Sequence, residues 1–125
     1  MKNFNRALFI TWVTLAAFLG TEAYGQINQG LISNTKAILK KADKEFERNA
    51  FHSAITLYKA VLEKEPENNE VKLKIAESYR FMNDLEKSDF WYKQFMDNAG
   101  FVEKINPVYR FYYGLVLESL GRYTE

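Results

Sequence analysis

Apolar residues recur at helical spacing along most of the chain after residue 33. Ile38, Ala42 and Phe46 are four residues apart, so a helix places them on one face. Asn49 interrupts this first helix, and a second apolar stripe follows at about 52–64. The pattern therefore predicts two helices joined by a tight turn.

The same order of elements then follows again. Helices are predicted from residue 69 to about 82, with Asn69 as the cap, and over about 85–96. After a longer connector, Asn106 and Pro107 begin a further helix that ends at Leu120, before Gly121. All predicted elements are helical, so the predicted fold class is all-α.

The second pair of helices repeats the first one 34 residues later. Small, aromatic and bulky positions coincide at this offset, and such a period is the signature of a helical repeat. The matching pairs are Ala42 and Ala76, Asn49 and Asn83, Phe51 and Leu85, Ala54 and Ser88, Tyr58 and Tyr92, and Val61 and Phe95.

A different pattern occupies residues 1–25. Basic residues precede thirteen uncharged residues at 7–19, which as a helix span about 20 Å, short of the ~30 Å of a bilayer core. Small residues just before Gln26 favour cleavage there. We expect a secretory signal peptide at 1–25, a short tail at 26–33, and folding outside the cytoplasm. A signal anchor that stays in the membrane is the alternative.

Charge and composition narrow the range of partners. Without the leader, which holds Lys2, Arg6 and Glu22, the 17 basic and 16 acidic residues become 15 of each sign. A net charge near zero gives no electrostatic reason to expect nucleic acid or an anionic membrane as partner. The chain has no cysteine, which excludes disulfides, thiolate metal sites and lipid attachment to a leader cysteine.

No residue pattern predicts catalysis. His52 is the only histidine, and without a serine or aspartate constellation we interpret it as a solvent-facing turn residue. An acidic cluster follows, but it lacks the alternating ligands and central glycine of a calcium loop, which favours a solvated helix end over a metal site. We expect no enzymatic activity, no cofactor and no metal. The cluster consists of Glu63, Glu65, Glu67 and Glu70.

The repeats resemble the tetratricopeptide repeat, a 34-residue helix-turn-helix unit with small residues where its two helices cross. Ala42, Ala76 and Gly114 match the small position of the family's first helix, and Ala54 and Ser88 that of its second. The resemblance implies a right-handed α-solenoid over 34–125. Its units would be 35–68, 69–102 and an incomplete 107–125. Other matches are Phe51, Leu85 and Tyr123 beside the turn, the aromatic Tyr58 and Tyr92, and Pro66, whereas Ile38 and Lys41 stand where the family has Trp and Leu.

The last predicted helix lacks a second helix after it in this sequence. A solenoid end normally carries a polar capping helix, because an uncovered apolar face costs solubility. We therefore expect either a fragment of a longer protein or a face that docks on a partner chain. The apolar side chains of this helix are Phe111, Tyr112, Tyr113, Leu115, Val116 and Leu117.

The order of signal peptide, the segment KADKEFERNAFHSAITLYKAVLEKEP and the helix YRFYYGLVLESLGRY also resembles the start of a bacterial envelope family. Its members carry tetratricopeptide repeats first, then a β-propeller and a C-terminal OmpA-like peptidoglycan-binding domain. Some serve in outer-membrane secretion and gliding machinery. The resemblance covers the N-terminal portion only and implies a periplasmic location, with outer-membrane association as one form of it.

In the tetratricopeptide family the first helices line a concave groove. The matching inward positions here are Lys36, Leu39, Asp43, Phe46, Glu70, Leu73, Glu77, Arg80, Val108, Phe111, Leu115 and Glu118. The lysine and asparagine set of the family's carboxylate clamp is missing. We therefore expect a protein or peptide segment anchored on apolar side chains, with Arg80 fixing a carboxylate or carbonyl. The candidate groove residues are Leu39, Asp43, Phe46, Leu73, Glu77, Arg80, Phe111 and Leu115.

Two functions fit these features. The first is a non-enzymatic interaction scaffold of the cell envelope that binds a protein segment in the groove. The second is a structural spacer, or a segment that docks on the downstream domains of a longer chain, with no groove ligand of its own.

Overall fold

A computed structural model of the chain describes residues 34–97 and 104–122. The predicted leader and tail, the Ala99-Gly100 part of the connector, and Tyr123 lie outside the described residues. Residues 37–122 belong to one compact unit. Every regular element in the described part of the chain is a helix, which confirms the all-α prediction.

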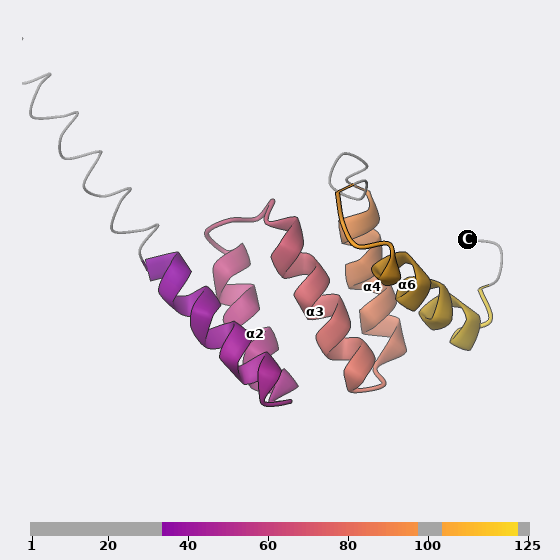
Figure 1. Cartoon of the computed structure of the whole chain (residues 1–125), viewed down its shortest axis with the longest axis horizontal. Helices are drawn as coiled ribbons and strands as arrows, with labels where there is room; N and C mark the ends of the chain where they lie inside the picture. The colour runs from indigo at the N-terminus through magenta and orange to yellow at the C-terminus, as the bar shows by residue number, and fades with distance from the viewer. Residues whose placement is uncertain (1–33, 98–103, 123–125) are drawn as a thin grey trace, which may run out of the picture. The chain divides into compact units, whose positions relative to one another are not determined.

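Five helical stretches follow one another within residues 34–97 and 104–122. The first covers residues 34–47, and the others are α2 (Phe51–Leu62), α3 (Asn69–Phe81), α4 (Leu85–Met96) and α6 (Val108–Ser119). Figure 1 shows neighbouring helices side by side, with α3 between α2 and α4 and with α6 beside α4. Two antiparallel helix pairs are thus followed by a fifth helix.

The turns inside the helix pairs repeat in detail. Asn49 and Asn83, 34 residues apart, have the left-handed φ values 61° and 59°, and Gly121 has φ 71°. Each closes a helix with the same two hydrogen bonds. The N–H of the left-handed residue donates to the carbonyl oxygen three residues earlier, and the N–H of the next residue donates to the carbonyl oxygen five residues earlier. An asparagine tolerates this conformation better than other residues with a β-carbon. The turn that sequence periodicity predicted therefore occurs three times.

We expect Asn83→Ala to lower the free energy of unfolding by about 1 kcal/mol, because alanine has the β-carbon but no polar group suited to left-handed φ. Asn83→Gly should stay within about 0.5 kcal/mol of the parent chain, because glycine has no β-carbon. Urea unfolding followed by circular dichroism measures both. Equal stabilities of the alanine and glycine variants would contradict this account of the turn.

The helix starts differ from the prediction at α3. Asn68, not Asn69, is the N-cap, and its side chain accepts a hydrogen bond from the Val71 N–H at 3.2 Å. Asn69 is already helical and buried. The first turn of α3 is buried because Val71 and the apolar residues after it pack in the core. At α6 the N-cap is Pro107, which has no side-chain cap, and not Asn106 as predicted; the Asn106 side chain still accepts a hydrogen bond from the Val108 N–H at 3.0 Å.

Two hydrophobic clusters form the core, and α3 contributes to both. The first joins residues 37–47, α2 and α3 around Ala42, Ala54 and Tyr58, all fully buried. The second joins α3, α4 and α6 around Ala76, Tyr92, Phe95 and Val116. Because α3 is covered on two sides, it is the most buried of the helices that the structure describes.

Small residues stand where the paired helices meet. Ala42 and Ala54 are fully buried in the first pair, and Ala76 and Ser88 in the second. The Ser88 hydroxyl donates to the Ala76 carbonyl oxygen at 3.0 Å, so the two helices approach closely there. Gly114, the third small residue in this series, is instead exposed.

Each helix pair also holds a tyrosine against a carboxylate fifteen residues earlier. Tyr58 Oη donates to Asp43 Oδ1 at 2.7 Å, and Tyr92 Oη donates to Glu77. The pKa of Tyr58 is raised above its ordinary value by burial, and further by the hydrogen bond to Asp43. This link between first and second helix was not predicted from the repeat pattern.

Candidate functional site

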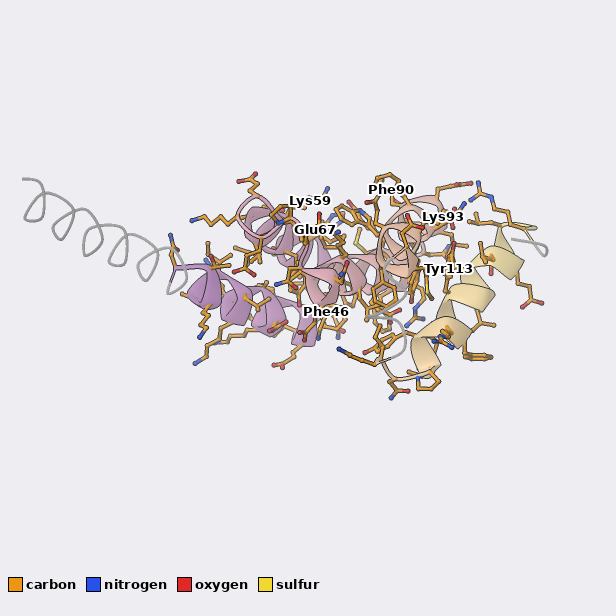
Figure 2. The ribbon with its side chains drawn as sticks, turned by 90° about the horizontal axis from the view of Figure 1, so that it is seen from above. Phe46, Lys59, Glu67, Phe90, Lys93 and Tyr113 are labelled. Carbon is orange, nitrogen blue, oxygen red and sulfur yellow. The ribbon has the colours of Figure 1, made fainter. Side chains whose placement is uncertain are left out.

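A cavity of about 280 Å³ opens between residues 37–47, α3 and α6. Of its nine lining residues, four are aromatic, two are aliphatic and three are charged, so apolar walls surround a small set of charged groups, as in many binding pockets. In Figure 2, Phe46 lies on the edge of the helices opposite the labelled Phe90 and Lys59. The lining residues are Phe46, Leu73, Lys74, Glu77, Arg80, Phe81, Val108, Tyr109 and Tyr112.

An ion pair of α3 lines this pocket. The Arg80 guanidinium donates through Nε at 3.1 Å and Nη2 at 2.7 Å to the two carboxylate oxygens of Glu77. Glu77 is buried and also accepts the Tyr92 hydroxyl. The hydrogen bond to Glu77 raises the pKa of Arg80. The guanidinium of Arg80 is therefore already paired with a carboxylate of its own helix.

Arg80 is also stacked between two aromatic rings. Its guanidinium carbon lies 4.5 Å from the ring centre of Phe81 and 4.4 Å from that of Tyr112. A guanidinium between two ring faces is held by cation–π attraction on both sides. Arg80 thus connects α3 to α6 and acts as a wall of the pocket, rather than as the free cation that the sequence suggested.

The remaining cation of the pocket is Lys74. Its ammonium lies 5.0 Å from the ring centre of Phe46 and makes no ion pair with any residue that the structure describes. Phe46 and Phe81 are in edge contact, with ring centres 5.9 Å apart. Phe51 stacks on Phe81 behind them at 5.2 Å. The pocket therefore presents an aromatic surface with one ammonium group beside it.

The structure brings four of the eight candidate groove residues to this pocket, namely Phe46, Leu73, Glu77 and Arg80. The other four lie elsewhere. Leu39 packs against the first core cluster, and Asp43 accepts the Tyr58 hydroxyl. Phe111 and Leu115 are 62% and 40% exposed and do not line the cavity.

Sequence reasoning did not select four of the lining residues, which are Lys74, Phe81, Tyr109 and Tyr112. On α6 the helix turns Tyr109, Tyr112 and Val116 inward. Tyr112 falls four residues after Val108, so helical spacing from that inward position would have found it. Nothing comparable marks Phe81, which is the last residue of its helix.

Comparison with known proteins finds no matching family model, no matching curated protein and no matching solved structure.

The histidine and the acidic side chains are the other candidates for chemistry in this sequence. His52 is exposed, and its carbonyl oxygen accepts the Thr56 hydroxyl at 3.0 Å. Within residues 34–97 and 104–122, no three His, Asp or Glu side chains converge as metal ligands would. Over the same residues, no helix combines the length and apolar character needed to cross a bilayer.

Proposed function

We propose that the chain is a non-enzymatic, tetratricopeptide-type scaffold of the bacterial cell envelope that binds a polypeptide segment in the pocket between α3 and α6. The observation that carries the binding proposal is the pocket itself, with its aromatic walls and the ammonium of Lys74. The envelope location rests on the predicted signal peptide and on the resemblance of the N-terminal portion to OmpA-family envelope proteins.

The repeat assignment is supported by the recurrence of three features. The left-handed turns at Asn49 and Asn83, and the hydrogen bonds of Tyr58 and Tyr92, each recur after 34 residues. The small residues at the helix crossings do so too. A right-handed solenoid of such units is the arrangement that we propose for this fold.

The chemistry of the pocket specifies the segment that it would bind. The rings of Phe46, Phe81 and Tyr112 favour an apolar side chain, because contact with it removes their apolar surface from water. Arg80 is engaged by Glu77, so an incoming carboxylate is paired by Lys74 instead. We therefore expect an apolar side chain next to an acidic residue in the bound segment.

Peptide selection tests this proposal directly. We expect the full chain to enrich binders from a displayed library of random peptides, and Phe81→Ser to weaken the enriched peptides about tenfold. Phe90→Ser is the matched control, because Phe90 is 55% exposed, as against 53% for Phe81, but lies outside the pocket. Fluorescence anisotropy measures both affinities.

The proposal fails if no peptide is enriched, or if the two phenylalanine variants weaken binding equally. Lys74→Gln should weaken peptides that carry an acidic residue, and should leave their amide counterparts within about twofold.

The second candidate function is that of a structural spacer or docking segment with an empty pocket. It is favoured by the apolar side chains Phe111 and Leu115 of α6, which are 62% and 40% exposed. Under that function the library selection yields no pocket-dependent peptide.

A further inference from the structure

The helix α6 is held to the rest of the chain by little buried surface. Within residues 108–119, which the structure describes in full, Val116 is the one buried residue, whereas α3 has eight. Segments with few buried apolar contacts open at a lower free energy than the core of the same protein. Separation of α6 from its neighbours should therefore cost less free energy than unfolding of the whole chain.

The same helix supplies one wall of the pocket. Val108, Tyr109 and Tyr112 of α6 line the cavity, and the ring of Tyr112 lies 4.4 Å from the guanidinium carbon of Arg80 on α3. The other lining residues come from residues 37–47 and α3. When α6 separates from its neighbours, the pocket loses this wall.

A buried carboxylate of α4 holds α6 at two points. Asp89 is 4% exposed, and it accepts hydrogen bonds from the Tyr113 hydroxyl at 3.0 Å and from Arg122 Nη1. Arg122 also pairs with Glu86 at 3.2 Å, and Lys93 of α4 pairs with Asp89 at 3.5 Å. Tyr113 is in the middle of α6 and Arg122 comes just after its end. One side chain of α4 thus fixes both the middle and the C-terminal end of α6.

We propose that α6 opens and closes as a separate wall of the pocket, and that Asp89 is the positioning residue that keeps it closed. Closed means packed on α4 as in the structure. Asp89 is not among the lining residues, so it acts on the pocket through α6. The opening of α6 does not depend on what the pocket binds; its effect on binding rests on the proposed function.

Thiol labelling tests the separate opening, because the chain has no cysteine of its own. Val116→Cys places a thiol beneath α6, and Val71→Cys makes the same change at a buried position of the other core cluster. In the full chain, we expect the thiol at position 116 to react at least ~10 times faster than that at 71, and low urea to accelerate the reaction at 71 more steeply. Each rate is divided by that of the same chain unfolded in urea.

Hydrogen exchange of the unmodified chain makes the same comparison without a substitution. The amides of α6 should exchange at least ~10 times faster than those of α3. Equal protection of the two helices, or equal labelling of the two thiols, would mean that α6 opens only when the whole chain unfolds, and would overturn the proposal.

Substitution of the two acidic partners of Arg122 tests the role of Asp89. In the Val116→Cys chain, we expect Asp89→Ala to accelerate labelling ~10-fold, because Tyr113 and Arg122 lose a buried charged acceptor. Glu86→Ala is the matched control and should stay within about twofold, because the Glu86 side chain is 69% exposed.

Tyr113→Phe removes only the hydroxyl of Tyr113. It should accelerate labelling in the Val116→Cys chain, but should have no further effect once Asp89 is alanine, since both changes break the same hydrogen bond. If Asp89→Ala and Glu86→Ala accelerate labelling equally, Asp89 does not position α6.

A ligand that needs the wall formed by α6 binds the closed form and should slow its opening. We expect a peptide enriched from the displayed library, at ten times its dissociation constant, to slow labelling of the Val116→Cys chain about 10-fold. The same peptide concentration should slow it only about twofold when Phe81→Ser is added, because that change weakens binding. A peptide that binds in the pocket without slowing the labelling would overturn the role of α6 as its wall. If no peptide is enriched, the proposed function fails, whereas the labelling and exchange results still decide whether α6 opens separately.

Discussion

Ala76→Arg should abolish the cooperative thermal unfolding of this protein. Ala76 is fully buried where α3 meets α4, and its carbonyl oxygen accepts the Ser88 hydroxyl. An arginine there must either force the two helices apart or bury an unpaired guanidinium. Overpacking costs roughly 1–3 kcal/mol and an uncompensated buried charge several more, which approaches the whole stability of a small domain. Far-UV circular dichroism during heating measures the loss.

Gly114→Arg is the control for this substitution. It makes the longer side-chain change at the matching position of α6, where a β-carbon meets no neighbouring atom. Arginine also has a better helix propensity than glycine, by roughly 1 kcal/mol. The control should therefore melt cooperatively at or slightly above the parent temperature. A cooperative, parent-like melt of Ala76→Arg would contradict the close crossing of α3 and α4.

Glu77→Ala should lower the free energy of unfolding by about 3 kcal/mol, the range found when one partner of a buried ion pair is removed. Its carboxylate binds the Arg80 guanidinium and the Tyr92 hydroxyl at once. The alanine variant leaves the buried Tyr92 hydroxyl without its acceptor, and leaves Arg80 between two rings without a counter-charge. Urea unfolding at neutral pH measures the change.

Two further variants separate charge from hydrogen bonding. Glu77→Gln keeps an acceptor for Tyr92 but removes the charge, so we expect a smaller loss, about half that of the alanine variant. Glu118→Ala removes an exposed carboxylate from α6 and should change stability by less than about 0.5 kcal/mol. If Glu77→Ala and Glu118→Ala are equally stable, the Glu77 network does not contribute to folding as proposed.

Most of the helices could be predicted because their signals are local. The four-residue spacing of Ile38, Ala42 and Phe46, and the asparagines at 49 and 83, mark a helix and its end through contacts within one or two turns. The boundary error at Asn69 has the same origin. Asn68 and Asn69 are equally good caps by residue type, and burial of Asn69 against the core decides between them.

The candidate site was predicted in part. Phe46, Leu73, Glu77 and Arg80 were placed in one groove from their repeat positions, and they do line one cavity. The role of Arg80 could be read only in part from the sequence, because Glu77 and Phe81 are its neighbours on α3, whereas the ring of Tyr112 comes from α6 and reaches it only in the tertiary structure. Whether these residues bind a ligand stays a prediction.

The sequence by itself determined the helices, their 34-residue period, the small residues at their crossings and the turns that join them. Each of these follows from backbone preferences and side-chain size within a short segment. Only the tertiary structure decided which side of α6 faces the pocket. Val116 is buried in the core cluster with α4 residues, and Tyr113 donates to Asp89 of α4 at 3.0 Å, which fixes the rotation of α6 about its own axis. That rotation turns Tyr112 inward and leaves Phe111 exposed, because the packing of a helix on its neighbours, rather than its own periodicity, sets its orientation.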